Sequence, residues 1–245
     1  MKPAIVLVHG AWGGAWIWRR VLPLLRSSGH EVHAVTLTGV GERAHLLGPA
    51  IGLHTHVADV LGLVQAEELR ELVLVGHSYG GIVVTGAADR LLDQGLALRG
   101  VVHVDAAIPL PGESWSSPHP PQVVAERTAL AAAHGGALPP PDPAGFGLEG
   151  ADRDWLLRRQ VPHPFGPYRE ALHFDAARLA RLPRLFIDCV APAYPTIATA
   201  RQRARSLPGW TVVERPWGHA PMVDHPRELS ALLLGFGPLA PSGLR

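Results

Sequence analysis

Six short apolar runs occur along this chain of 245 residues, and most are separated by segments long enough for helices. Strands that are apolar on both faces belong to parallel sheets covered by helices on both sides. The sequence therefore predicts an α/β fold with a mostly parallel central sheet flanked by helices. The runs are Ile5 to Val8, Glu31 to Leu37, Leu72 to Val75, Val101 to Val104, Leu185 to Val190 and Thr211 to Val213.

The segment 106–183 departs from this pattern. It is rich in proline, it contains helix candidates at Gln122 to His134 and Asp152 to Gln160, and no strand is expected in it. We interpret it as a cap inserted after the fourth recognisable strand, over the carboxyl edge of a core formed by residues 1–105 and 184–245. A chain of this length fits one domain with an insertion better than two domains. Its aromatic residues could line a pocket or form the cap's own small core; they are Trp115, Phe146, Trp155, Phe165, Tyr168 and Phe174.

The pentapeptide Gly76-His77-Ser78-Tyr79-Gly80 directly follows the third apolar run and matches the pattern G-x-S-x-G. In this pattern the serine occupies a sharp turn between a strand and a helix, where small neighbours relieve the crowding of a strained backbone. A helix expected over Ile82 to Leu92 would place its positive dipole end behind the serine. Ser78 is therefore the best candidate for a nucleophile, and the backbone N–H of Tyr79 is placed to bind a developing oxyanion.

An acyl-transfer site also needs a base and a second oxyanion donor. Among the 14 histidines His219 is the best base, because it follows the last apolar run and Gly218 allows close approach to the serine. His77 and His103 are expected to be buried, hydrogen-bonded structural residues instead. The glycine-rich loop after the first run offers the backbone N–H of Ala11 as the second donor.

Four segments together resemble one branch of the α/β-hydrolase superfamily, which contains plant methylesterases, hydroxynitrile lyases and related bacterial esterases. The resemblance covers nearly the whole chain outside the cap and implies an α/β-hydrolase fold. Lyases of this branch have Thr in the first loop and Lys beside the catalytic His, whereas this chain has Ala11 and Ala220 there and so looks like the esterases. The segments are His9 to Trp16, Thr36 to Arg43, Gly76 to Gly81 and Trp217 to His219.

The catalytic acid is the part of this pattern that the sequence leaves open. The family usually presents an Asp in the loop before the histidine strand, but Cys189 to Thr196 holds no acid, and none occurs between Asp188 and Glu214. Asp188 lies inside an apolar run, where an ionised carboxylate would cost on the order of several kcal/mol unless it is paired. Asp105 closes the fourth run at the carboxyl edge, a position that some α/β hydrolases use for the acid. The alternatives are an Asp105 that only anchors the cap, and a Ser-His dyad without an acid.

We expect a serine esterase that cleaves a carboxylic ester of a small-to-medium apolar or aromatic substrate through an acyl-enzyme. The expected substrate contacts are Trp12, Trp115 and Trp155. Because no acid stands in the usual loop, two alternatives stay open: lyase or cyclase chemistry on a biosynthetic intermediate, and a binding protein with incomplete machinery. A dinucleotide-dependent reductase would rest on Gly39-Val40-Gly41 alone, which lacks the third glycine of G-x-G-x-x-G.

Composition narrows the expected partners. The net charge is +1 and the basic residues are scattered, which favours a small-molecule substrate over nucleic acid or a membrane surface. No metal or organic cofactor is expected, since no Cys/His cluster has zinc spacing. The composition is also compatible with a homodimer. The single Cys189 and the short apolar run next to Met1 predict a cytoplasmic location, and the scarcity of lysine indicates a bacterial source.

Overall fold

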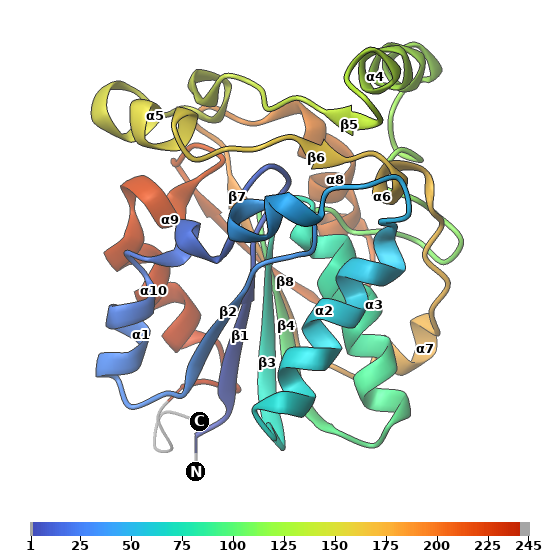
Figure 1. Ribbon diagram of the computed structural model, residues 1–245. Coiled ribbons are helices and arrows are strands. Elements are labelled where there is room, and N and C mark those ends of the chain that lie inside the picture. The colour runs from blue at the N-terminus through green and yellow to red at the C-terminus, as the bar shows by residue number, and fades with distance from the viewer. Residues whose placement is uncertain (1, 241–245) are drawn as a thin grey trace.

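A six-stranded sheet forms the centre of the computed structural model, which describes residues 2–240 (Figure 1). Its strand order is β2-β1-β3-β4-β7-β8, and each neighbouring pair is parallel. All six expected runs form strands, so the predicted parallel sheet is confirmed. The strands are β1 (Ala4–Val8), β2 (Val32–Val35), β3 (Glu71–His77), β4 (Ala97–Val104), β7 (Arg184–Cys189) and β8 (Trp210–Arg215).

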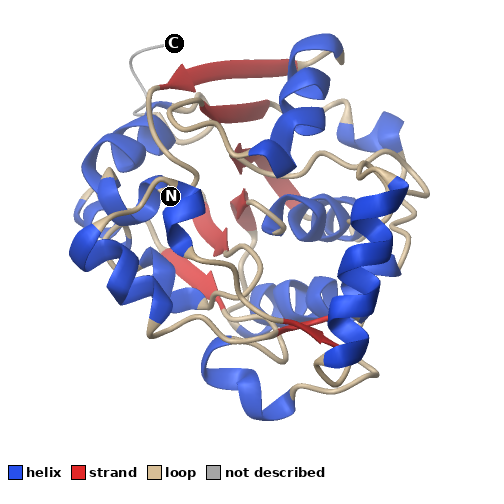
Figure 2. Ribbon diagram, turned by 90° about the horizontal axis from the view of Figure 1, so that it is seen from above, coloured by secondary structure: helices blue, strands red, loops and turns tan. Residues whose placement is uncertain are grey.

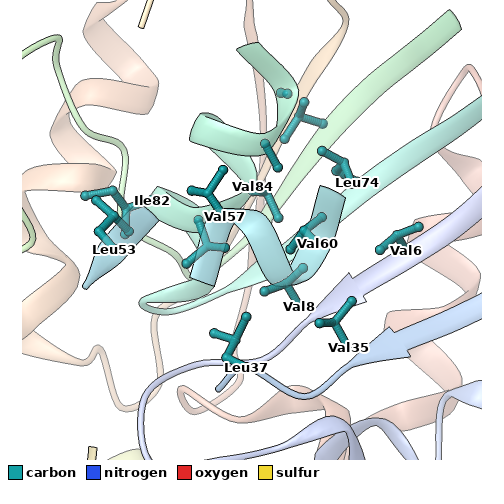
Figure 3. Packing of buried hydrophobic residues seen from close by; sticks show 14 of the residues in the cluster. Val6, Val8, Val35, Leu37, Leu53, Val57, Val60, Leu74, Ile82 and Val84 are labelled. Atoms are coloured by element: carbon teal, nitrogen blue, oxygen red, sulfur yellow. The ribbon is translucent and has the colours of Figure 1, made fainter. Parts of the chain in front are cut away.

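Helices cover both faces of the sheet, as Figure 2 shows from above. Successive side chains of a strand point to opposite faces, so Val6 and Leu74 pack with α2 and α3 (Figure 3), while Ile5 and Val73 pack with α1 and α10. Burial of both faces is the reason why the central strands β1 and β3 are almost entirely apolar, whereas the edge strand β8 is only partly buried and carries charged residues. These helices are α1 (Leu22–Ser27), α2 (Leu53–Ala66), α3 (Gly80–Asp93), α8 (Ala198–Ser206), α9 (Pro221–Asp224) and α10 (Pro226–Gly235).

Much of the segment 106–183 lies above the carboxyl ends of the strands in Figure 1. Helices α4 and α5 form close to the expected ranges. The expectation that this segment contains no strand is wrong, because β5 and β6 pair antiparallel; two residues per strand are too few to produce a recognisable pattern. The elements are α4 (Pro121–Ala133), β5 (Ala137–Leu138), α5 (Gly150–Leu157), β6 (His163–Pro164), α6 (Gly166–Arg169) and α7 (Ala176–Leu179), with short 3-10 turns at η1 (Ala15–Trp18), η2 (Gly41–Leu46), η3 (Pro143–Phe146) and η4 (Pro195–Ile197).

The strand order decides which loops meet above the sheet. The chain leaves β3 at Ser78, β4 at Asp105 and β8 in the loop that carries His219. Since β1, β3, β4 and β7 are successive neighbours, the loops at their carboxyl ends lie side by side, where parallel sheets bind their ligands. Within residues 2–240, no helix is long and apolar enough to cross a membrane.

Candidate active site

Ser78 occupies the sharp turn between β3 and α3 that the pentapeptide predicts. Its φ angle is 52°, in the left-handed region that side chains rarely adopt. The flanking positions must be glycine because any side chain there would collide with the backbone. A Cβ on Gly76 would lie 2.6 Å from the Gly80 carbonyl oxygen, and one on Gly80 would lie 2.7 Å from the His9 carbonyl oxygen. The turn thus presents the Ser78 hydroxyl at the carboxyl edge of the sheet.

His219 connects the Ser78 hydroxyl to a carboxylate. Its Nε2 lies 2.9 Å from Ser78 Oγ, and its Nδ1 lies 2.6 Å from Asp105 Oδ2. Because an ionised carboxylate can only accept, Nδ1–H donates to Asp105, and Nε2 accepts the hydrogen bond of the Ser78 hydroxyl. Both His219 and Asp105 are buried. These are the contacts that an acyl-transfer triad needs.

The structure brings Asp105, and not Asp188, to the imidazole. Asp105 follows β4, and its backbone N–H donates to Ile187 O on β7 at 2.8 Å. Asp188 lies on β7 and is paired instead with Arg201 and Arg205, at 2.6 and 2.7 Å. The 2.6 Å contact of Asp105 lies within the range expected for an acid that orients the base. This geometry speaks against the two alternatives of a cap anchor alone and of a dyad.

Two backbone donors stand at the nucleophile. Tyr79 follows Ser78 at the start of α3, and Ala11 lines the small hollow around Ser78 and His219. In the described chain, neither N–H donates to another protein group. Both are therefore available to a developing oxyanion, the role predicted for them.

Aromatic groups fix the imidazole of His219 on several sides. The Tyr194 ring stacks on it with centroids 4.2 Å apart, and the Phe146 ring lies 5.3 Å away. The backbone N–H of His219 donates to the backbone carbonyl of Phe146 at 2.8 Å. His77 donates its Nε2–H to the His219 carbonyl at 2.7 Å, and burial holds the pKa of His77 well below its ordinary value, so it stays neutral. Like His77, His103 is buried and hydrogen-bonded, as expected. Tyr194 was missed by the sequence reasoning, although it lies in the loop searched for an acid.

A narrow, mostly apolar cavity opens beside Ser78 and is lined by the predicted contacts Trp12 and Trp115. The Trp12 indole N–H donates to Leu138 O at 3.0 Å, and its carbonyl accepts from Val161 N–H at 3.1 Å. Trp12 therefore ties the loop after β1 to the cap. Other lining side chains are Ile82, Ile108, Tyr194, Ile197 and Ala200.

The structure does not bring Trp155 into this cavity, so its predicted role as a substrate contact is not supported. Its ring packs edge-on against Trp16 with centroids 5.1 Å apart, and the guanidinium groups of Arg20 and Arg159 lie over it. On α5 it is Leu156 that turns inward. The helix pattern was too weak to show which face is buried. Phe165 and Tyr168 stack on each other within the cap.

Comparison with known proteins identifies the fold family. A model described as the alpha/beta hydrolase family matches residues 5–232. The chain belongs to this family. It is 39% identical over 241 residues to a carbendazim hydrolyzing esterase of Nocardioides sp., covering 95% of this chain and 98% of that protein. It is 28% identical to a pyrethroid hydrolase of Sphingobium wenxiniae, covering 95% and 86% of the two chains.

Solved structures agree on the fold. An extracellular alpha/beta-hydrolase from a Paenibacillus species superposes with a TM-score of 0.84 at 20% identity, covering 96% of this chain and 99% of that one. The plant relatives include a methylesterase and an alpha-hydroxynitrile lyase of Arabidopsis thaliana, each matched over little more than a third of this chain. The predicted membership of the α/β-hydrolase superfamily, in the branch of these relatives, is confirmed.

Proposed function

We propose that this protein is a serine esterase that hydrolyses a carboxylic ester through an acyl-enzyme. The observation that carries the proposal is the unbroken hydrogen-bonded chain Ser78–His219–Asp105 at the wall of an apolar cavity. Relatives named as esterases or hydrolases along almost the full chain support it. The Asp105 carboxylate supplies the acid that the usual loop lacks, which argues against an incomplete site. Hydrolysis is favoured over lyase or cyclase chemistry by the relatives named as esterases or hydrolases.

In the first half-reaction, Ser78 Oγ attacks the ester carbonyl carbon while His219 Nε2 takes its proton. Asp105 accepts from Nδ1–H, holds the ring in the required tautomer and stabilises the imidazolium. The backbone N–H groups of Ala11 and Tyr79 bind the oxyanion of the tetrahedral intermediate. When this intermediate collapses, the alcohol leaves with the proton from Nε2, and the acyl group stays on Ser78.

In the second half-reaction, a water molecule gives its proton to His219 Nε2 and attacks the acyl carbonyl. The same two N–H groups bind the second oxyanion, and Ser78 leaves with the proton as the acid product is released. The two half-reactions thus use the same groups: His219 takes and returns the proton, and the same two N–H groups bind the oxyanion. The chain supplies nucleophile, base, orienting acid and oxyanion donors by itself.

The cavity favours apolar or aromatic esters of small-to-medium size. Trp12, Trp115 and aliphatic side chains make most of its wall apolar, and such a wall gains free energy by covering apolar surface. Polar and charged side chains, Glu113 and Arg203 among them, also line it, and these two are paired with each other. The relatives named for carbendazim and pyrethroid hydrolysis fit this substrate class. A small-molecule partner is part of this proposal; a cytoplasmic location, a bacterial source and a homodimer stay predictions from the sequence.

The test is to label the protein with a fluorophosphonate, to locate the adduct by mass spectrometry and to assay a panel of acyl and aryl esters. We expect the adduct on Ser78, and Ser78→Ala should abolish labelling and lower kcat by about four to six orders of magnitude. Ser116→Ala, a cap serine outside the cavity, is the control and should behave as wild type. An adduct elsewhere, or full ester turnover by Ser78→Ala, would refute the proposal.

A further inference from the structure

A nearly buried guanidinium stands behind the catalytic acid. Asp105 uses Oδ2 for His219, and its other oxygen, Oδ1, accepts from Arg201 Nη2 at 2.8 Å. Arg201 also donates from Nε to Asp188 Oδ1 at 2.6 Å. Its side chain is 13% exposed, and those of Asp105 and Asp188 are 0% and 1% exposed. One guanidinium therefore lies between two buried carboxylates.

The remaining donors of Arg201 reach the backbone beside His219. Nη1 donates to Tyr194 O at 2.8 Å, and Nη2 also donates to Cys189 O at 3.0 Å. The ring of this same Tyr194 stacks on the His219 imidazole. From helix α8, Arg201 thus contacts three places: Asp105 at the end of β4, the end of β7, and the loop between β7 and η4.

The buried carboxylates of Asp105 and Asp188 need a positively charged partner such as Arg201. A carboxylate removed from water is destabilised unless it is paired and hydrogen-bonded, and it can otherwise rotate or take up a proton. A guanidinium has a planar fork of donors in fixed directions, so it constrains the plane of a carboxylate more than an ammonium group does. With Oδ1 held in this way, Oδ2 of Asp105 has one orientation, toward His219.

We propose that Arg201 is a positioning residue for the reaction: it fixes the plane of the Asp105 carboxylate and, through the Tyr194 carbonyl, the aromatic ring that packs on His219. The inference rests on the proposed esterase function. Arg201 does not itself line the cavity, and its hydrogen bond to the lining residue Tyr194 goes to the backbone carbonyl. Its loss therefore acts on the chemical step through Asp105 and Tyr194, and leaves the binding of substrate largely intact.

Helix α8 supplies a matched control. Arg205 pairs with the same Asp188 at 2.7 Å but contacts neither Asp105 nor Tyr194. The side chain of Arg205 is more exposed than that of Arg201, 45% against 13%, so the pair tests the charge that each provides to Asp188. A role through Asp188 alone predicts that substitutions of Arg201 and Arg205 affect activity alike. A positioning role predicts that only Arg201 matters for kcat.

The experiment compares Arg201→Gln, Arg201→Lys and Arg205→Gln by kcat, KM and thermal unfolding. We expect Arg201→Gln to lower kcat about 10- to 100-fold, the range found when a group that orients a metal ligand is lost, with KM changed less than about threefold. Arg201→Lys keeps the positive charge but lacks the planar fork of donors, so its kcat should lie between those of wild type and Arg201→Gln. Arg205→Gln should keep the kcat of wild type. A wild-type kcat in folded Arg201→Gln, or an equal loss in Arg205→Gln, would overturn the inference.

Proton NMR gives a readout that does not depend on turnover. The Nδ1 proton between His219 and Asp105 should give a strongly deshielded signal that is absent in Asp105→Asn. We expect this signal to be weakened or displaced in both Arg201 variants and unchanged in Arg205→Gln; an unchanged signal in Arg201→Lys contradicts the inference even if Arg201→Gln does not fold. Absence of ester turnover and of Ser78 labelling in the wild type would instead refute the proposed function, and the NMR comparison would still decide the role of Arg201.

Discussion

Backbone strain is concentrated in the residues around the reaction centre. Trp12, Ser78 and Asp105 have φ angles of 62°, 52° and 40°, a region that costs non-glycine residues on the order of 1–3 kcal/mol each. Backbone hydrogen bonds hold two of them in place: Ser78 O accepts from Ala107 N–H at 2.9 Å, and Asp105 donates to Ile187 O. The sheet thus maintains conformations that aim the nucleophile and the acid at His219.

Asp105→Asn tests the acid directly. The amide can offer an N–H to Nδ1 of His219, which favours the tautomer with its proton on Nε2, so that the ring can no longer accept from Ser78. We expect kcat to fall by about four orders of magnitude, with little change in KM because Asp105 does not line the cavity. Steady-state kinetics beside a thermal unfolding curve would measure both effects. A larger change in KM than in kcat would show that Asp105 only anchors the cap.

Among the strands and loops, the elements that are most deeply buried were the easiest to predict from the sequence. The central strands were found because they are apolar on both faces, and the partly exposed edge strand β8 because of its short run Thr211 to Val213. Ser78 and His219 were found because glycine turns follow strands. The contact of Asp105 with His219 depends on β4 lying beside β7 in the sheet, and strand order is not written in any local pattern. The cap was harder still: Trp155 and Trp115 look alike in the sequence, and only the packing of α5 separates them.

The link between the loop after β1 and the cap can be tested with Trp12→Phe. Phenylalanine keeps much of the ring but removes the N–H that bonds Leu138 O, and an unpaired buried acceptor costs about 1–3 kcal/mol. We expect a lower melting temperature and a KM raised several-fold, with kcat changed less, since Trp12 lines the cavity. Trp155→Phe is the matched control: it should leave KM unchanged. A change in KM for Trp155→Phe would show that Trp155 does contact the substrate, against the structure.

The whole molecule carries several histidines that are buried in neutral form. Burial lowers the pKa of His9 and of His56 to about 4, and that of His103 to about 3. Their hydrogen bonds fit neutral rings: His9 donates from Nδ1 to Gly10 O at 2.6 Å and accepts from Leu37 N–H at Nε2, 3.1 Å away. A second proton on such a ring would replace an acceptor by a donor, so protonation opposes the fold.

Stability should therefore fall as the pH drops from about 6.5 toward 4. In this window the unfolded chain takes up protons on these histidines while the folded chain does not, so the free energy of unfolding rises with pH, by up to about 1.4 kcal/mol per pH unit for each histidine. Carboxylates with lowered pKa, such as Glu113, act in the same direction but mainly below about pH 4.5. Urea unfolding at pH 7.5, 6.5 and 5.5 measures the slope, and His56→Gln should reduce it by about one proton. A flat profile between pH 7 and 5 would mean that these rings are protonated in the folded protein, against the burial and hydrogen bonding that the structure gives them.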